Sequence, residues 1–449
     1  MYSKLSDIWH QLSNEWGIMR IPRNHYLEKL VRKKHNGSVK VVTGVRRCGK
    51  SYLLFEIFRD HLREAGVPDE QVIELALDED ENVRYRDPSE LSAFLNERIV
   101  DREKQHYVLL DEVQLAISRE EMRNPDVPTR LYGILNGLLR RGNVDVYVTG
   151  SNSKMLSSDV RTEFWGRGDE VEVRPLSFSE YYAFAGGERA AAYEDYVLFG
   201  GMPRVALTSD DEDKLSYLQS LFALVYFRDI VERYEIGLPD VLAAITDDLC
   251  SSVGSLTNAN KISKSLGSVR GARGTAVSVD TVSSYLSHLT ESFLFSEAKR
   301  YDVKGKRYFD YPSKYYCVDV GLRNARLSLR QQEETHIMEN IVYNELVHRG
   351  FAVDVGAIEI SGKNAEGKRT RKSCEIDFVA NKGSERIYIQ SAPSMEDETK
   401  ADQKLRPLLG VNDFFRKVVV SKTLARPWTD GSGVLHIGIY DFLTDGSAI

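Results

Sequence analysis

Cysteine is scarce in this sequence, and the few cysteines lie far apart. Four occur in 449 residues, at positions 48, 250, 317 and 374, and no two form a Cys-x-x-Cys pair. A zinc ribbon needs such pairs, and a chain of this size does not need a disulfide framework to fold. Isolated thiols of this kind are typical of a reducing compartment, so we expect a cytoplasmic protein.

Long apolar runs and an excess of positive charge are also missing. No stretch approaches the roughly 18 uninterrupted apolar residues of a membrane span. The start of the chain, Met-Tyr-Ser-Lys-Leu-Ser-Asp, lacks the apolar segment of a signal peptide. We therefore expect no membrane contact. The formal net charge of −7 gives no overall electrostatic footprint for nucleic acid, although a local basic face stays open.

The composition nevertheless supports several folded cores. Hydrophobic residues make up 42% of the sequence, and its 449 residues favour two to four domains. Between about 37 and 175, short β-branched runs alternate with helical patterns. This rhythm predicts an α/β fold with a parallel sheet covered by helices on both faces. The expected strands are 39–43, 72–77, 107–110 and 144–148, and the expected helices are 51–64, 88–102 and 129–140.

A glycine-containing loop follows the first expected strand and precedes a helix. It fits the pattern G-x-x-x-x-G-K-[ST], whose backbone N–H groups wrap around phosphates at a helix N-terminus. The alternative is a glycine turn before a capped helix, but the strand before the loop and the helix after it favour a nucleotide-binding loop. We therefore expect ATP as the ligand. The expected nucleotide-binding residues are Gly44, Val45, Arg46, Arg47, Cys48, Gly49, Lys50, Ser51 and Tyr52.

Two carboxylates at the end of the apolar run 107–110 complete the expected catalytic site. Lys50 would bring positive charge to the β- and γ-phosphates, and Ser51 and Asp111 would hold Mg²⁺. Glu112, the next residue, would polarise the attacking water. A solvated strand end is the alternative for a lone Asp-Glu pair, but its spacing from the loop favours the catalytic interpretation.

Polar residues after the expected strand 144–148 supply further candidates. Ser151 and Asn152 would lie near the γ-phosphate, because this strand should sit beside the strand that precedes the loop. A polar turn that caps a helix is the alternative. Arg161 or Arg167 could act as an arginine finger, in this subunit or in a neighbour, or could form an ordinary surface ion pair. Our expected catalytic set is Lys50, Glu112, Asn152 and Arg167.

Several motifs occur together along the chain. They are the loop at 44–51, Leu-Leu-Asp-Glu-Val-Gln at 109–114, Thr-Gly-Ser-Asn-Ser at 149–153, and the segments 175–180, 199–203, 226–230, 314–322 and 339–345. In this combination the chain resembles the prokaryotic AAA+ ATPases of the AAA_14 type whose C-terminal half is the domain of unknown function DUF4143. The resemblance implies an ATPase domain, then a winged-helix-like block and a restriction-endonuclease-like fold.

From the pattern and the resemblance we expect five segments. They are N-terminal helices at 1–36, a P-loop AAA+ core at 37–175, a helical lid or linker at 176–240, a winged-helix-like domain at 241–312, and a restriction-endonuclease-like DUF4143 domain at 313–449.

The winged-helix-like segment is the expected place of any DNA contact. Residues 257–266 and 277–286 read as helix, turn, helix, and the second helix of such a pair can enter the major groove. Winged helices also bind proteins, and acidic residues dilute the local charge, so both kinds of partner stay open. The basic residues that could meet phosphates are Lys261, Lys264, Arg270, Arg273, Lys304, Lys306 and Arg307.

The last segment carries an incomplete nuclease pattern. Glu345, Asp377 and Gln390 follow the order of metal ligands in the PD-(D/E)xK nucleases, but Ala392 stands where the lysine is expected. Alanine has no charge to stabilise a transition state. Lys382 and Lys400 are the nearest replacements. We expect a domain that is inactive as a nuclease.

The main hypothesis is therefore an ATPase that uses Mg²⁺ and acts as a switch or motor on a macromolecular partner. An ATP-gated DNA-binding regulator with negligible hydrolysis is the second hypothesis, and a metal-dependent nuclease is the third. A homo-oligomer stays open, as does an unknown protein partner.

Overall fold

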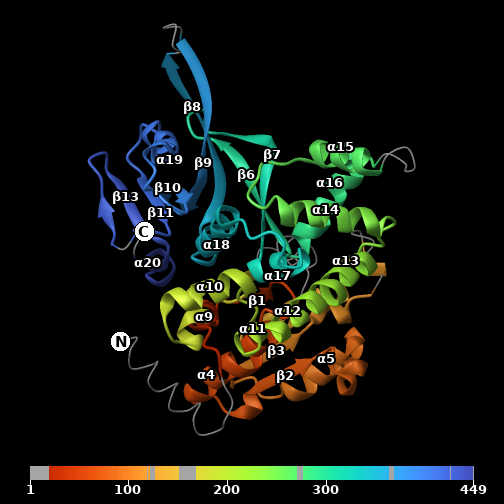
Figure 1. Cartoon of the computed structure of the whole chain (residues 1–449). Helices are drawn as coiled ribbons and strands as arrows, with labels where there is room; N and C mark the ends of the chain where they lie inside the picture. The colour runs from red at the N-terminus through yellow and green to blue at the C-terminus, as the bar shows by residue number, and fades with distance from the viewer. Residues whose placement is uncertain are drawn as a thin grey trace. The chain divides into compact units, whose positions relative to one another are not determined.

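The computed structural model describes residues 20–118, 120–121, 127–150, 168–270, 277–363, 369–424, 426–447 and 449. The chain divides into two compact units, Met1–Arg174 and Pro175–Ile449 (Figure 1). Within the described residues, no helix has the length and apolar character needed to cross a membrane.

The first unit is built on a parallel five-stranded sheet in the order β2-β3-β4-β1-β5. The central strands β1, β3 and β4 are buried along their whole length, as expected for a sheet covered on both faces. β4 pairs with β1, as the sequence predicted, whereas β5 was not anticipated. The strands are β1 Val39–Thr43, β2 Val72–Ala76, β3 His106–Asp111, β4 Val144–Thr149 and β5 Gly168–Glu172.

Helices of the first unit cover this sheet. The helix after the loop runs without a break from Lys50 to Glu64 and includes a π-helical stretch at Leu53–Phe58. The next long helix starts at Pro88, where the Asp87 carboxylate accepts hydrogen bonds from two backbone N–H groups. The helical elements are α2 Asn24–Arg32, α3 Lys50–Tyr52, η1 Leu53–Phe58, α4 Arg59–Glu64, η2 Asp69–Gln71, η3 Asp80–Arg86, α5 Pro88–Arg98, η4 Val113–Ala116 and α7 Arg130–Leu139.

An ion pair is buried inside this sheet. Lys40 on β1 binds Asp145 on β4, and their side chains are 0% and 2% exposed. The Tyr147 hydroxyl donates to the same carboxylate at 2.9 Å, and the His35 backbone N–H does so at 3.1 Å. Burial lowers the pKa of Lys40, and the hydrogen bond to Asp145 opposes that shift. Lys40 therefore depends on Asp145 to remain charged in the core.

The second unit begins with helices. Ser177 and Glu180 form a capping box at the start of the first one, each side chain accepting a backbone N–H of the other. The helices are α9 Phe178–Ala185, α10 Arg189–Phe199, α11 Pro203–Ala206, α12 Asp211–Ser220, η6 Leu221–Phe227, α13 Arg228–Arg233, α14 Pro239–Ser251, α15 Ala259–Arg270, α16 Val279–Glu291, α17 Val320–Arg326, α18 Glu334–His348, α19 Glu398–Leu409 and α20 Ile439–Thr444.

A mixed eight-stranded sheet in the order β12-β13-β11-β10-β9-β8-β6-β7 organises the rest of this unit. The expected domain boundary between 312 and 313 falls inside β7, which pairs with β6 on both sides of that point, so the boundary is corrected. The strands are β6 Phe295–Asp302, β7 Arg307–Cys317, β8 Ala352–Lys363, β9 Arg369–Lys382, β10 Glu385–Ala392, β11 Arg416–Ser421, β12 Trp428–Thr429 and β13 Val434–Gly438.

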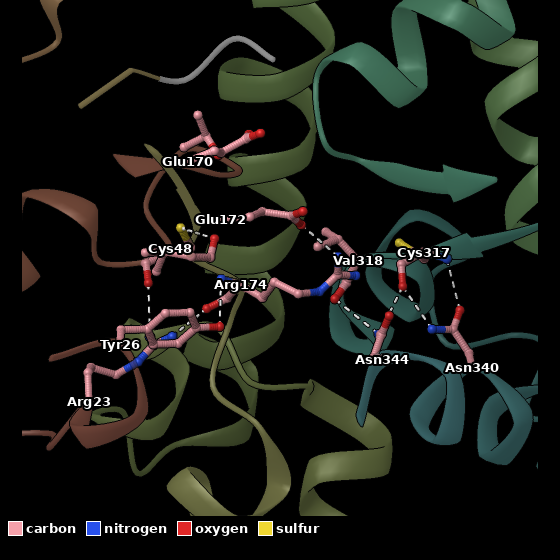
Figure 2. Close-up of polar contacts among 12 residues, drawn as sticks. Arg23, Tyr26, Cys48, Glu170, Glu172, Arg174, Cys317, Val318, Asn340 and Asn344 are labelled. Carbon is pink, nitrogen blue, oxygen red and sulfur yellow. Dashed lines mark hydrogen bonds and ion pairs between the residues drawn. The ribbon is translucent and has the colours of Figure 1, made fainter. Parts of the chain in front are cut away.

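Three polar side chains form hydrogen bonds with the backbone around the end of β7. Asn340 on α18 exchanges two hydrogen bonds with the backbone of Cys317, and Asn344 donates to the carbonyls of Cys317 and Val318 (Figure 2). Asp319, just beyond, accepts from the N–H of Gly201 at 2.6 Å and of Leu322 at 3.0 Å. These polar side chains replace the backbone partners that β7 loses where it ends.

Two glycines follow α10 because neither position has room for a side chain. A side chain at Gly200, whose φ is +71°, would collide with the Asp319 carboxyl group. One at Gly201 would collide with the Leu176 carbonyl oxygen. Burial raises the pKa of Asp319 to about 6, and the N–H groups of Gly201, Leu322 and Gly321 act in the opposite direction. The site is therefore sensitive to pH and to any side chain added at the turn.

Candidate nucleotide-binding site

The loop between β1 and α3 has a backbone that only glycine allows at two points. Gly44 has a φ of +133°, and a Cβ there would collide with the carbonyl oxygen of Val173. Gly49 has a φ of +99° and directly precedes Lys50, the first residue of the helix. The loop therefore closes tightly onto β1 and delivers its last residues to a helix N-terminus, where N–H groups are available to an anion.

Lys50 is folded back over this loop. Its ammonium donates to the carbonyl oxygens of Gly44 at 2.9 Å and of Val45 at 3.1 Å, and the residue is 4% exposed. These two bonds hold the positive charge over the loop, and both acceptors are neutral carbonyl groups. A phosphate group would be a stronger acceptor than either carbonyl, because charge-assisted hydrogen bonds are about twice as strong as neutral ones.

The carboxyl ends of β3 and β4 bring three polar side chains together. Thr149, the last residue of β4, donates its hydroxyl hydrogen to Asp111 and accepts the backbone N–H of Glu112 at 3.0 Å. Burial raises the pKa of the Asp111 carboxyl, while the hydroxyl groups of Ser51, on the helix after the loop, and of Thr149 lower it. Thr149 was not among the predicted site residues, although its place at a strand end beside β3 was available from the sequence.

Glu112 is held in an uncommon backbone conformation directly after β3. Its φ is +52°, in the left-handed region, and its carboxylate accepts a hydrogen bond from the Gln114 side-chain amide. The residue is half-buried. A non-glycine residue in this region costs free energy, and such strain is concentrated at functional sites. The turn points the chain away from the strand immediately after Asp111, so the two carboxylates have different surroundings.

The arrangement fits a magnesium ion held mainly by a nucleotide. The Ser51 hydroxyl and the Asp111 carboxylate offer oxygen atoms, the ligands that Mg²⁺ prefers, and Mg²⁺ often takes only one or two protein carboxylates besides phosphate and water. Within the described part of the chain, no group of three or more His, Cys, Asp or Glu side chains could hold a metal ion. An all-protein metal cage is therefore not what these residues form.

A buried arginine ties the loop to the end of the first unit (Figure 2). Arg23, which is 2% exposed, donates to the carbonyl of Cys48 at 3.1 Å and to that of Arg174 at 2.6 Å. The Tyr26 hydroxyl accepts the backbone N–H of Arg174 at 3.1 Å, and the Cys48 thiol donates to Val173 at 3.2 Å. Burial raises the pKa of the Cys48 thiol. No sequence pattern signals this contact, because the partners of Arg23 are backbone atoms far along the chain.

The remaining predicted residues of this site divide into two groups. Arg46 and Tyr52 are half-buried, and Arg47 is exposed with a φ of +61°. Ser151, Asn152, Arg161 and Arg167 lie outside the described residues.

The carboxylates of the incomplete nuclease pattern each have a partner within the protein, and Gln390 accepts the Asp377 backbone N–H at 3.2 Å. Glu345 binds Arg349 at 2.7 Å on its own helix. Asp377 accepts from the Ser391 N–H at 2.8 Å and binds Lys404 at 2.7 Å. Lys404 thus reaches the carboxylate, whereas Lys382 donates to the carbonyl of Arg349.

Another lysine, Lys314, binds two further carboxylates near Asp377. Lys314 on β7 is 4% exposed and binds Glu339 on α18 at 2.9 Å and Glu375 on β9 at 2.7 Å. Burial opposes its charge, but Glu339, Asp377 and Glu375 together raise the pKa of Lys314. The Tyr316 hydroxyl donates to Glu339 at 2.7 Å. The cluster is neutralised by side chains of the protein itself.

The first unit has a parallel sheet, a loop of the phosphate-binding kind after β1, and a pair of carboxylates at the end of β3. These features define a P-loop ATPase fold. Residues 36–182 match a family model described as an AAA domain, AAA_14. Residues 190–333 match a different model, a domain of unknown function called DUF8612. The expected DUF4143 domain is therefore wrong, and DUF8612 takes its place.

Relatives extend over nearly the whole chain. An uncharacterized protein of Haemophilus influenzae is 31% identical over 423 residues, which cover 93% of this chain and 97% of that protein. The chain belongs to the same family as this protein. An uncharacterized protein of Methanocaldococcus jannaschii is 26% identical over 402 residues, covering 85% and 81% of the two chains. A Walker-type ATPase of Pyrococcus abyssi has 18% identity and a TM-score of 0.46, covering 69% of this chain and 96% of its own.

Proposed function

We propose that this protein binds ATP with Mg²⁺ in the loop Gly44–Ser51 and hydrolyses it, acting as a nucleotide-driven switch or motor on a macromolecular partner. Lys50 binds the β- and γ-phosphates in this proposal. Glu112 orients the attacking water, and Ser51 and Asp111 hold the metal ion. When bound, Mg²⁺ would neutralise part of the phosphate charge.

The observation that carries the proposal is the network at the carboxyl edge of the sheet. Thr149 joins Asp111 and Glu112 through one hydroxyl group, and Ser51 reaches the same Asp111 from the helix after the loop. The network connects the loop with Asp111, the proposed metal ligand, and with Glu112, which orients the attacking water in this proposal. These are the three parts that phosphoryl transfer needs in a fixed geometry.

The raised pKa of Asp111 adds a physical reason for metal binding. Burial makes the negative charge on this carboxylate costly while no cation is near. A divalent cation bound beside Ser51 would remove that cost, so part of the metal affinity would come from the relief of an unfavourable buried charge. Asn152 and Arg167 complete the proposed catalytic set, as a γ-phosphate sensor and an arginine finger.

The direct test compares ATP turnover by the wild type with two variants. Lys50→Ala should lose nucleotide binding and turnover together, because the phosphate charge loses its partner. Glu112→Gln should bind ATP normally but turn it over at least about 100-fold more slowly, as expected when a group that acts on the attacking water is neutralised.

The control for this test is Glu81→Gln, which neutralises an exposed carboxylate in the same unit. It should hydrolyse ATP like the wild type. If Lys50→Ala and Glu112→Gln also hydrolyse ATP like the wild type, the proposal is wrong.

A second function is favoured by the two helices α15 and α16. Ser278 caps α16, and the side chains of Lys261 and Lys264 on α15 are exposed. We propose a winged-helix-like role for this region, in which ATP binding without appreciable hydrolysis regulates a DNA contact. Tight ATP binding without turnover, together with a DNA affinity that changes on adding ATP, would favour this function over the first.

For the region from β7 to the end of the chain we propose a restriction-endonuclease-like domain that is inactive as a nuclease. The support is the pairing of its carboxylates with Lys314 and Lys404. Plasmid cleavage in Mg²⁺ or Mn²⁺ that disappears in Asp377→Ala would contradict this proposal.

A further inference from the structure

Strands β8 and β9 continue well past the other strands of their sheet (Figure 1). On one side, β6 pairs with β8 only at Val355–Ala357, and on the other, β10 pairs with β9 only from Phe378 onward. Beyond these points the register between β8 and β9 runs from Ile358↔Cys374 to Lys363↔Arg369. Within the described residues no third strand pairs with this stretch. It is therefore a two-stranded ribbon about 17 Å long.

One face of the ribbon is covered near its base, and the other is not. Ile358 and Ile360 belong to the cluster that includes Leu405 and Leu408 of α19. Residues on alternate positions point to the opposite face. On that face Glu359 and Arg371 have side chains 67% and 79% exposed. The ribbon thus has a base fixed by α19 and an outer face open to solvent.

The outer part of the ribbon is basic, although the whole protein carries a formal charge of −7. Lys363 and Arg369 are paired in register, and Arg371 and Lys372 follow on β9, both exposed. Glu359 is the acidic residue among these described positions and lies 3.8 Å from Arg371. Positive charge is therefore concentrated along the part of the two strands that lies beyond the sheet.

The turn between β6 and β7 adds positive charge at the base. Lys304, Lys306 and Arg307 are exposed there, and the Lys304 ammonium donates to the Glu359 carbonyl at 2.8 Å. Arg300 donates to the Ser373 hydroxyl at 3.4 Å, on the same face as Arg371. These contacts fix the turn against the ribbon, so the two groups of basic residues form one surface.

We propose that this basic ribbon, β8 from Ile358 and β9 up to Cys374 with the β6–β7 turn at its base, binds duplex DNA. The major groove is about 12 Å wide and admits a two-stranded ribbon, and the ribbon is long enough to reach across it. Arginine and lysine on its outer face neutralise the phosphates on either side of the groove. This proposal concerns the partner of the protein and does not depend on ATP hydrolysis.

An anionic membrane is the other polyanion that such a charge could meet, and the sequence of the ribbon argues against it. From Ser361 to Ser373 the residues are Ser-Gly-Lys-Asn-Ala-Glu-Gly-Lys-Arg-Thr-Arg-Lys-Ser, without a large apolar or aromatic side chain. A segment that lies in a membrane interface needs such side chains on one face to bury. Charge without apolar area fits a nucleic-acid backbone better.

The test compares two variants that each remove one exposed positive charge from the full-length protein. Arg371→Ala changes the outer face of the ribbon, and Lys264→Ala changes α15, the other candidate DNA surface. Binding to a labelled duplex of about 20 base pairs is measured by fluorescence anisotropy over roughly 0.05–0.2 M salt. Circular dichroism and thermal unfolding of both variants serve as folding controls.

The wild type should bind with an affinity that falls steeply with salt. Removing one side chain that neutralises a phosphate should reduce the slope of log K against log salt by about 0.9, which corresponds to about an eightfold loss of affinity at 0.1 M salt. The ribbon variant should show this loss, and the α15 variant should bind as the wild type does. A-form duplex RNA should bind more weakly than DNA, because its major groove is too deep and narrow for the ribbon.

Three results would overturn the proposal. The first is no DNA binding by the wild type at the lowest salt concentration. The second is normal binding by the ribbon variant, and the third is equal affinity for duplex RNA and duplex DNA. Loss of ATP turnover in Glu112→Gln with DNA binding intact would leave the ribbon proposal standing, so the failure of one proposal is distinguishable from failure of the other.

Discussion

The Thr149 hydroxyl offers a sharp test of the nucleotide site, because one oxygen atom contacts both carboxylate residues. It donates to Asp111 and accepts the backbone N–H of Glu112 at 3.0 Å. Thr149→Val keeps the shape of the side chain and removes only this oxygen. Asp111 then loses a hydrogen bond to its charged form, and the turn that carries Glu112 loses its link to β4.

The magnitude follows from the kind of hydrogen bond that the substitution removes. A hydrogen bond to a charged group contributes about 1.5–3 kcal/mol. If that contribution is felt in the transition state, kcat falls by about 10- to 150-fold, since each 1.4 kcal/mol corresponds to a factor of ten. The dissociation constant for ATP should stay within about threefold of wild type, because the loop and Lys50 are unchanged.

Steady-state ATP hydrolysis and equilibrium binding of a fluorescent ATP analogue separate these two effects. Thr149→Ser keeps the hydroxyl and should recover most of the turnover. Thr246→Val is the matched control, because its hydroxyl is equally buried but bonds only the Leu242 carbonyl within α14. This role of the Thr149 hydroxyl is refuted if Thr149→Val turns over ATP within about twofold of wild type, or if Thr149→Ser is as slow as Thr149→Val.

Two further predictions concern stability. In Asp319, a pKa raised from 3.8 to about 6 means that the folded state holds its proton more tightly, so the unfolding free energy falls as pH rises from about 4 to 6, by about 3 kcal/mol. Urea unfolding of the wild type relative to Asp319→Asn should show this pH-dependent difference, and a difference independent of pH would contradict it. Lys40→Met should destabilise the first unit by about 3–5 kcal/mol, because the buried Asp145 carboxylate loses its ion pair. Adding Asp145→Leu should recover part of that loss; urea unfolding that places Lys40→Met within about 1 kcal/mol of wild type would refute the dependence on the pair.

The candidate nucleotide site could be proposed from the sequence because its parts are local in sequence. The loop at 44–51 has a fixed spacing, and the carboxylates at 111 and 112 follow a continuous apolar run, so each could be found without knowing the fold. The adjacency of β4 and β1 was also predicted correctly. Contacts such as that of Arg23 with the carbonyls of Cys48 and Arg174 were not predictable, because backbone acceptors leave no residue type to recognise.

Sheet edges were harder to predict than sheet centres. β5, Gly168–Glu172, has alternating and half-exposed positions, so it lacks the continuous apolar run by which β1 and β3 were found. The boundary expected at 312 fails for a related reason. Residues on both sides of it belong to the long strand β7, whose pairing with β6 holds the hairpin together.

The nuclease pattern shows that two glutamates on one helix can have different partners. Glu339 and Glu345 are six positions apart on α18, so successive residues at 100° place them on different faces of the helix. Glu339 meets Lys314 at the sheet, whereas Glu345 meets Arg349 one turn further along the helix. Sequence order alone favoured Glu345, and only the packing of the helix distinguishes the two.

The lysines in that cluster also bear on what the second unit does. Glu339 and Glu375 bind the Lys314 ammonium, and Asp377 binds Lys404. A divalent ion at this place would lie beside two ammonium groups, and the repulsion between like charges would oppose its binding. We infer that this centre stabilises the unit as an internal ion-pair network. If the basic ribbon binds DNA, as we propose, a unit of this kind would hold the duplex without cleaving it.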